Sequence, residues 1–186
     1  MATYLILFRG INVGGKNILS MAALQACLEE LDYANVTTFI ASGNVIIQSS
    51  KKPAAVKAQI EKVLPKKFKL DSELIKVLVV TRQQLQAVVT HKPKGFGDQP
   101  KKYHCDVIFL MGIPAEEALR VFSPKTGVDT IWPGPGVIYS QRLSAKRTQS
   151  RLNRMMSSPL YKSMTIRTWN TTTTLLEMVK TIDEKY

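Results

Sequence analysis

Cysteine is scarce in this sequence, and long apolar runs are missing from it. Its two cysteines, Cys27 and Cys105, are too few for a disulfide-stabilised scaffold, and each lies in an apolar stretch. We therefore expect both to be reduced, buried thiols of a cytoplasmic protein. No apolar run approaches the roughly 20 residues that a membrane-spanning helix needs. The N-terminal stretch MATYLILF has neither a basic leader nor a cleavage-site pattern, so the sequence predicts no signal peptide and no membrane association.

Histidine is equally scarce, and this narrows the possible chemistry. Neither His91 nor His104 has an Asp or Glu at the spacing of a catalytic triad or a metal site, so we expect both to be structural. The chain also lacks H-x-x-x-H, C-x-x-C and paired-carboxylate patterns, which disfavours metal-dependent hydrolysis and glycosidase chemistry. The sequence predicts no metal site, indicates no particular cofactor and leaves open whether the protein is an enzyme.

Acidic residues are few relative to basic ones. The 186 residues hold 26 Lys and Arg against 14 Asp and Glu, a formal net charge of +12. Such a balance favours anionic partners. Residues 51–69 carry seven Lys with Glu61 as their one acid, which we interpret as a solvated face. Residues 142–167, named the basic segment below, carry no acid and hold Arg142, Lys146, Arg147, Arg151, Arg154, Lys162 and Arg167.

Hydrophobic periodicity in residues 1–90 predicts the order β-α-β-β-α-β, which is the ferredoxin-like unit. Ser20 is a good N-cap for the first helix, and Asn35 is placed to close it in a left-handed conformation. Thr81 and Gln84 have the spacing of a capping box. We expect strands at 3–9, 36–41, 44–50 and 75–80, and helices from Ser20, from Pro53 to Pro65 and from Thr81 to about Val89.

The second half repeats this order more loosely. Residues 91–102 (HKPKGFGDQPKK) are rich in Pro and Gly and are predicted to be a linker. Residues 103–186 then show a strand, a short helix, a hairpin around Pro133–Gly136, a basic helical segment, a short strand and a last helix. We therefore predict an α+β protein of two ferredoxin-like βαββαβ-type halves, with antiparallel sheets and helices on one face.

The stretch RGINVGGKN at residues 9–17 follows the first predicted strand and fits G-x-x-x-x-G-K from Gly10. A phosphate loop begins its helix at the Gly-Lys pair and carries Ser or Thr next for magnesium. Here the helix cap is Ser20, four residues beyond Lys16, and Asn17 has no hydroxyl. The stretch is therefore not expected to be a nucleotide-binding phosphate loop.

The predicted topology places this loop beside the turn Ser42-Gly43-Asn44, because both lie at the same end of the sheet. Glycines allow close approach of a ligand to backbone N–H groups, and such groups form anion-binding nests. We expect Arg9 and Lys16 to supply charge and Asn12 and Asn44 to orient a small anionic ligand. The complete predicted site comprises Arg9, Gly10, Asn12, Gly14, Gly15, Lys16, Ser42, Gly43 and Asn44, with Arg167 and Asn170 added if the two halves face one another.

Three motifs resemble a known family. The stretches LFRGINVGGKN, T-x-x-x-SGN (from Thr38) and TIRTWNT are similar to those of the bacterial domain of unknown function number 1697, over essentially the whole chain. The third motif differs from the usual T-R-N-W-N-T in having Thr168 where the first Asn stands. The resemblance implies an α+β fold of ferredoxin-like topology and a bacterial origin, and it brings no established activity.

Two alternatives to small-anion binding remain. RNA-recognition modules share this topology but stack bases on aromatics of the third strand, and NVIIQSS has none. Tyr4 and Phe8 share one face of the first strand, which is expected to pack on the helices. In this alternative, the phosphate backbone of a nucleic acid is expected to bind to Arg142, Lys146, Arg147, Arg151 and Arg154. The second alternative is a protein-interaction or dimerisation module, with Trp132 and Trp169 as the aromatics of interest and an undetermined oligomeric state.

Overall fold

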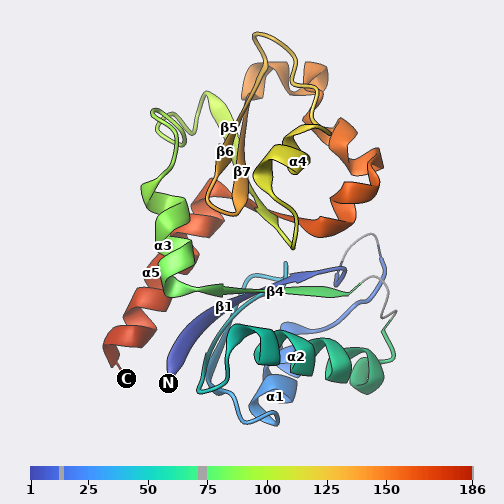
Figure 1. Ribbon diagram of the computed structural model, residues 1–186, viewed down its shortest axis with the longest axis vertical. Helices are drawn as coiled ribbons and strands as arrows, with labels where there is room; N and C mark the ends of the chain where they lie inside the picture. The colour runs from blue at the N-terminus through green and yellow to red at the C-terminus, as the bar shows by residue number, and fades with distance from the viewer. Residues whose placement is uncertain (13–14, 71–74, 186) are drawn as a thin grey trace. The chain divides into compact units, whose positions relative to one another are not determined.

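The chain divides into two compact units (Figure 1). The computed structural model describes residues 1–12, 15–70 and 75–185. Unit 1 comprises Met1–Leu85 together with Leu175–Tyr186, and unit 2 comprises Gln86–Thr174. Each unit holds one four-stranded sheet, and each is described by itself below.

The sheet of unit 1 has the order β2-β3-β1-β4 with antiparallel neighbours, which confirms the predicted ferredoxin-like topology. Helices α1 and α2 lie on the same side of this sheet in Figure 1. The elements are β1 (Ala2–Arg9), α1 (Met21–Glu29), β2 (Ala34–Phe39), β3 (Asn44–Ser49), α2 (Pro53–Phe68), β4 (Lys76–Thr81) and α3 (Arg82–Thr90).

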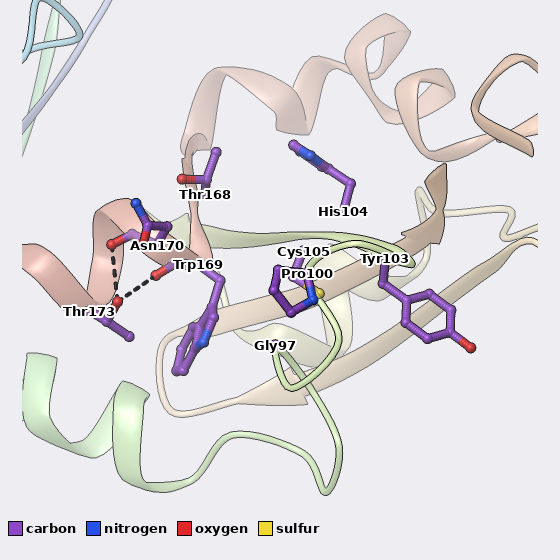
Figure 2. Close-up of a pocket in the computed structure, with 9 residues that line it drawn as sticks. All are labelled: Gly97, Pro100, Tyr103, His104, Cys105, Thr168, Trp169, Asn170 and Thr173. Atoms are coloured by element: carbon purple, nitrogen blue, oxygen red, sulfur yellow. Dashed lines mark hydrogen bonds between the residues drawn. The ribbon is translucent and has the colours of Figure 1, made fainter. Parts of the chain in front are cut away.

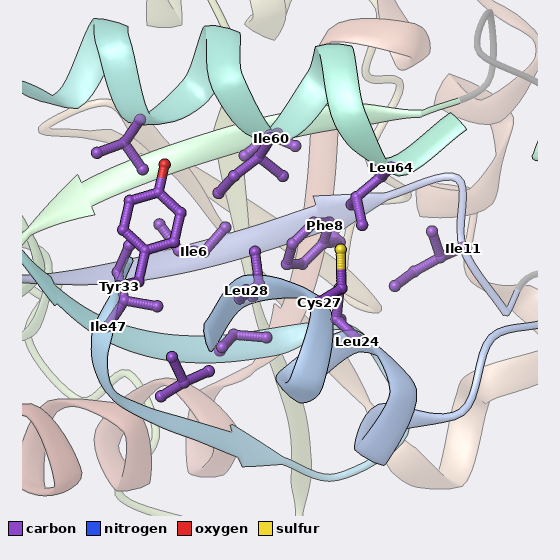
Figure 3. Close-up of a cluster of buried hydrophobic side chains, with 14 of the residues drawn as sticks. Ile6, Phe8, Ile11, Leu24, Cys27, Leu28, Tyr33, Ile47, Ile60 and Leu64 are labelled. Atoms are coloured by element: carbon purple, nitrogen blue, oxygen red, sulfur yellow. The ribbon is translucent and has the colours of Figure 1, made fainter. Parts of the chain in front are cut away.

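The core of unit 1 lies between the sheet and these two helices (Figure 3). Alternate residues of β1, including Tyr4 and Phe8, pack against Leu24 and Leu28 of α1 and Ile60 of α2. Tyr4 is 6% exposed and Phe8 is 2% exposed. Both aromatics therefore belong to the core, as expected, and neither offers a surface on which a nucleic-acid base could stack.

The helix caps of unit 1 follow the local sequence signals. Ser20 Oγ accepts a hydrogen bond from Ala23 N at 3.0 Å, which confirms it as the N-cap of α1. The predicted capping box is reciprocal, since Thr81 N donates to Gln84 Oε1 at 2.9 Å and Gln84 N donates to Thr81 Oγ1 at 3.2 Å. At both helix starts, the hydroxyl of the capping residue accepts a hydrogen bond from the backbone N–H three residues later, as the sequence predicts.

Two predicted helix ends in unit 1 are wrong. Helix α1 ends at Glu29, and Asn35 is instead a left-handed residue (φ 51°) within β2, where the pairing register with β3 shifts. Helix α2 runs through Pro65 to Phe68, and a left-handed Lys69 closes it. Proline removes one N–H from a helix, and so close to the helix end the packing of Leu64 and Phe68 on the core outweighs that loss.

Unit 2 repeats the topology with the strand order β6-β7-β5-β8, which confirms the predicted second copy of the element order. Three short 3-10 helices replace the predicted basic helical segment. Leu152 and Met155 of η2 are buried in the core and Leu160 and Tyr161 of η3 pack against it, a spacing that is not the apolar stripe of one α-helix. The elements are β5 (Tyr103–Leu110), α4 (Ala115–Leu119), β6 (Asp129–Gly134), β7 (Val137–Leu143), η1 (Ser144–Gln149), η2 (Leu152–Ser157), η3 (Pro159–Ser163), β8 (Met164–Thr168) and α5 (Trp169–Lys185). Helices α3 and α5 cross the unit boundary, since α3 continues into unit 2 from Gln86 and α5 into unit 1 from Leu175.

The segment 91–102, predicted as a linker, contributes to the core of unit 2. Phe96 is fully buried, and its ring meets Trp132, Tyr139 and Trp169 edge-on at centroid distances of 6.0, 5.2 and 5.3 Å. The many glycines and prolines of this segment turn the chain so that one aromatic side chain enters the core. The glycines and prolines correctly indicated that residues 91–102 form a loop, but they did not reveal that Phe96 fixes this loop in the core.

Among the described residues, no helix combines the length and the apolar character that crossing a membrane requires.

Candidate functional site

The two loops predicted to meet in unit 1 are in contact. We name residues 9–17 the glycine loop and residues 40–44 the SGN turn. Asn12 Nδ2 donates hydrogen bonds to Leu19 O at 2.9 Å and to Ala41 O at 3.2 Å, and Leu19 N donates to Asn12 Oδ1 at 2.7 Å. Phe8 N donates to Gly43 O at 2.9 Å. One amide side chain thus ties the glycine loop to the SGN turn, as the topology required.

The amide side chains of this region hold the loops rather than facing outward. Asn44 is fully buried, and its Nδ2 donates to Phe39 O at 3.1 Å and to Ser42 Oγ at 2.9 Å. Asn17 Nδ2 donates to Gly10 O at 2.8 Å. Because the amide groups of Asn12 and Asn44 are used within the protein, the expectation that they orient a ligand needs correction: they shape the loops that would receive it.

Left-handed backbone conformations are concentrated in these loops. Gly10, Asn12 and Asn17 have φ values of 88°, 53° and 48°, and Gly43 has a φ of 73°. Gly43 tolerates no side chain, since a Cβ atom there would lie 2.8 Å from Phe8 Cβ. Ile40 also has a positive φ, 49°, although a β-branched residue is a true outlier in that region. Such strain costs about 1–3 kcal/mol per residue and is typical of ligand clamps and switch regions.

The charged members of the predicted site lie at its edge. Lys16 and Gly15 are exposed, whereas Arg9 is half-buried at the end of β1, where it is in register with Lys76 of β4. Gly14 lies outside the described residues. Arg167 and Asn170 belong to unit 2 and are placed within that unit below.

Unit 2 contains a cavity of about 400 Å³, which we name the indole pocket (Figure 2). Three segments enclose it: the loop before β5, the first residues of β5 and the first turn of α5. Strand β8 pairs with β5 only as far as Asp106, so the pocket occupies the place beside β5 where β8 has ended. Its lining residues are Gly97, Pro100, Tyr103, His104, Cys105, Thr168, Trp169, Asn170 and Thr173.

His104 has a carboxylate partner that the sequence analysis missed. His104 Nε2 lies 3.0 Å from Asp106 Oδ1, because residues i and i+2 of a strand share a face. Burial raises the pKa of Asp106, and the nearby charges of His104 and Arg142 partly offset that rise. The alternation of side chains along β5 places residues 104 and 106 on one face and could have revealed this pair. A search for the spacings of catalytic triads or metal sites could not.

The setting of Cys105 disfavours its reactive thiolate form. Burial raises its pKa, although a hydrogen bond from the backbone of Gly97 partly opposes that effect, and the Sγ–H donates to Gln141 Oε1 at 3.4 Å. A thiol with a raised pKa is protonated at neutral pH and is a poor nucleophile. Cys27 is likewise free and buried, in the core of unit 1.

Arg167 is an internal cation rather than a surface contact. It is 7% exposed, and its Nη1 donates to Thr165 Oγ1 at 2.9 Å and to Ile166 O at 2.8 Å. Burial lowers the pKa of Arg167 to about 10, so it keeps its charge at neutral pH. The sequence could not distinguish this arginine from the exposed ones of the basic segment.

Four cations of the predicted nucleic-acid surface are exposed: Lys146, Arg147, Arg151 and Arg154. The fifth, Arg142, is half-buried in β7, in register with Asp129 and His104, and its Nε is buried with no hydrogen-bond partner among the described residues. Arg142 therefore belongs to the interior polar contacts of unit 2 and not to the exposed surface.

Asp129 anchors the start of the exposed basic surface. It is 7% exposed, and its Oδ2 accepts hydrogen bonds from Lys125 N at 3.0 Å and Arg151 N at 2.8 Å. Burial opposes its ionisation, but those backbone N–H groups, the Ser150 side chain and the charge of Arg142 together hold the pKa of Asp129 below its usual value. Local sequence patterns did not indicate this role, because one partner, Arg151 N, lies 22 residues further along the chain.

Comparison with known proteins agrees with the fold and assigns no activity. A family model described as "Protein of unknown function (DUF1697)" matches residues 1–139. The chain is similar in structure to the conserved bacterial protein SP0830 from Streptococcus pneumoniae, with a TM-score of 0.74 and 23% sequence identity over 96% of this chain and 98% of that one. At this identity the likeness shows the fold alone. None of the curated proteins matches the sequence.

Proposed function

The chain belongs to the DUF1697 family of proteins of unknown function, and we propose from its own residues that unit 1 binds a small anionic ligand, bearing a phosphate or carboxylate, between the glycine loop and the SGN turn. The observation that carries this proposal is the contact between the two loops through Asn12, together with the strained left-handed conformation of Ile40 beside that contact. A protein tolerates such strain where the surroundings hold a loop in one required shape.

The chemistry of the loops favours an anion over a cation. Hydrogen bonds within the region already use the backbone carbonyls of Gly10, Asn17, Ala41 and Gly43 as acceptors. Loops in which left-handed residues such as Gly10, Asn12, Asn17 and Gly43 recur can expose backbone N–H groups to an anion, as in an anion-binding nest. Lys16 is exposed at the rim and would add a mobile positive charge.

Replacing Lys16 by alanine is expected to weaken the binding of inorganic phosphate about 5- to 10-fold, because it removes the exposed cation of the site. The measurement is a phosphate titration of the ¹⁵N-labelled chain, followed through the amide signals of Gly15, Lys16 and Gly43. Lys62→Ala removes an equal charge from the exposed face of α2 and should leave the affinity unchanged. Equal effects of the two substitutions, or phosphate-induced shifts confined to other residues, would contradict the proposal.

A second candidate function is binding to a nucleic-acid backbone through unit 2. The observation that favours it is the joint exposure of Lys146, Arg147, Arg151 and Arg154 on a segment with no acidic residue between Asp129 and Glu177. Arginine makes forked contacts to phosphate, and such contacts release counterions. Contacts of Lys and Arg side chains to phosphates carry no base-sequence information, so we expect this surface to bind phosphates rather than to read bases.

The double substitution Arg147→Gln with Arg154→Gln is expected to weaken binding to a fluorescent 20-nucleotide single-stranded RNA. It should also reduce the slope of log affinity against log salt concentration by about 1.4, because each lost phosphate contact changes that slope by about 0.7. Fluorescence anisotropy between 50 and 200 mM salt measures both quantities. Lys62→Gln with Lys66→Gln, on the exposed face of α2, is the matched control and should change neither. An RNA affinity that does not depend on salt would exclude this second function.

A further inference from the structure

The indole pocket has the dimensions and the walls of a small-molecule site. Its volume of about 400 Å³ lies within the range of roughly 300–1,000 Å³ that ligand pockets occupy. All of its lining residues belong to unit 2, so the pocket is formed within one compact unit. It shares no residue with the loops of unit 1, so a ligand can bind here whether or not an anion binds there.

One wall of the indole pocket is a rigid aromatic plane. The ring of Trp169 is held edge-on by the fully buried Phe96, at a centroid distance of 5.3 Å and an interplanar angle of 78°. Gly97 presses against the same indole so closely that a Cβ atom there would lie 2.3 Å from Trp169 Nε1. Because both neighbours restrict the indole, the part of it that lines the pocket is fixed in position before any ligand arrives.

The rings of Pro100 and Tyr103 line the pocket as well (Figure 2). The ammonium group of Lys102 lies 5.1 Å from the centroid of the Tyr103 ring. A flat indole with further ring surfaces suits a planar, unsaturated ligand, which gains stacking energy that a branched aliphatic ligand would not.

A second wall is the first turn of α5. Thr168 caps this helix, since its Oγ1 accepts a hydrogen bond from Thr171 N at 3.2 Å, and the helix then continues for 17 residues with no acid in its first turn. The first backbone N–H groups of a helix have no partner within it and favour negative charge. The exposed side chain of Asn170 lies on this turn, and the Thr173 hydroxyl donates back to Trp169 O and Asn170 O at 3.2 and 3.0 Å.

The acids next to the lining residues in the chain are paired, and three cations adjoin lining residues in sequence. Asp106 is engaged by His104, and Asp98, in the loop before β5, is paired with Lys92 at 2.7 Å. The cations Lys101 and Lys102 directly precede the lining strand, and the charged Arg167 directly precedes the capping Thr168. The side chain of His104 is 41% exposed, and its Nε2 contacts Asp106.

From these walls we propose that the indole pocket binds a planar aromatic or heteroaromatic anion. The ring of the ligand stacks on Trp169, and its carboxylate or phosphate group lies at the first turn of α5, beside Asn170. Neither wall is sufficient alone: the indole selects a flat ring, and the helix terminus selects negative charge.

Four probes separate the two requirements. Benzoate and adenosine monophosphate combine a ring with an anion, benzamide has a ring without charge, and inorganic phosphate has charge without a ring. We expect the first two to bind at the indole pocket at least tenfold more tightly than the last two, as measured by titrating the signals of the pocket residues in the ¹⁵N-labelled full chain, which separates this pocket from the loops of unit 1. In ¹⁵N-labelled protein, the indole N–H signal of Trp169, assigned with the Trp132→Phe variant, should shift with benzoate and with adenosine monophosphate. Benzamide binding as tightly as benzoate, or the absence of any shift of the Trp169 signal, would overturn the proposal.

The substitution Asn170→Asp tests the location of the anionic group. An aspartate in the first turn of a helix is favourable to the helix, so this variant should fold normally. It places a carboxylate where the ligand's anion is expected and should weaken benzoate and adenosine monophosphate at least tenfold. Asn153→Asp makes the same charge change at an exposed position of η2 and should leave both affinities unchanged. Equal affinities in the two variants would show that the anion does not lie at α5. Phosphate binding to unit 1 should be the same in both variants, so failure of this proposal is distinguishable from failure of the loop site.

Discussion

Replacing Phe96 by alanine is expected to destabilise unit 2 by about 3–5 kcal/mol, the range typical of removing a fully buried phenylalanine. Phe96 is completely inaccessible to solvent and contacts three other aromatic rings edge-on. Its removal therefore leaves a cavity and also removes three favourable ring pairs, each of which contributes about 0.5–1.5 kcal/mol beyond the burial of area. The effect should be large although Phe96 lies in a stretch of Gly, Pro and Lys.

The tryptophans of the protein make this prediction measurable. Trp132 and Trp169 both belong to unit 2 and both contact Phe96, so their fluorescence during urea unfolding follows this unit. Tyr103→Ala is the control, since Tyr103 is a half-buried aromatic of the same unit and its loss should cost about 1 kcal/mol. A cost below about 1 kcal/mol for Phe96→Ala would mean that residues 91–102 are a linker after all, since surface substitutions usually have effects within about 0.5 kcal/mol.

Replacing Asp129 by alanine is expected to destabilise unit 2 by about 3 kcal/mol, since hydrogen bonds to a charged acceptor contribute roughly 1.5–3 kcal/mol each. Its Oδ2 accepts from two backbone N–H groups, those of Lys125 and Arg151, which lie on different loops. Alanine would leave both groups without this acceptor and would remove the carboxylate that faces Arg142 across the β6–β7 pair. Asp129→Asn keeps an oxygen that can accept the same bonds but no charge, and it should cost about half as much.

The destabilisation caused by Asp129→Ala should also depend on pH. The folded-state pKa of Asp129 is lowered, so the ionised carboxylate stabilises the folded chain. That stabilisation is fully present above the unfolded-state pKa of about 3.9 and is lost as the pH falls through the lower, folded-state value. The difference in unfolding free energy between wild type and Asp129→Ala should thus be constant near neutral pH and shrink below about pH 4. A difference that grows on acidification would contradict the assigned hydrogen bonds.

Local signals in the sequence were sufficient to predict the topology. The N-cap Ser20, the capping box of Thr81 and Gln84 and the Pro-Gly hairpin at 133–136 each act within a few residues, so they can be read without knowing the fold. From the resulting order of elements, the contact of the glycine loop with the SGN turn followed from topology alone, and Asn12 confirms it. The helix ends were less predictable, because at Pro65 tertiary packing outweighs a local preference.

The sequence by itself therefore determined two βαββαβ-type units, their basic character and the meeting of two loops in unit 1, since these depend on periodicity, capping and charge. Only the tertiary structure decided what each polar or aromatic side chain does. Phe96 in a presumed linker is a core residue, Arg167 is buried whereas Arg154 is exposed, and His104 is paired with Asp106. The indole pocket likewise could not be predicted from the sequence, because its walls come from segments about 70 residues apart. Only the antiparallel pairing of β5 with β8 brings these segments together. Such long-range contacts depend on the packing of the whole unit, which no local pattern records.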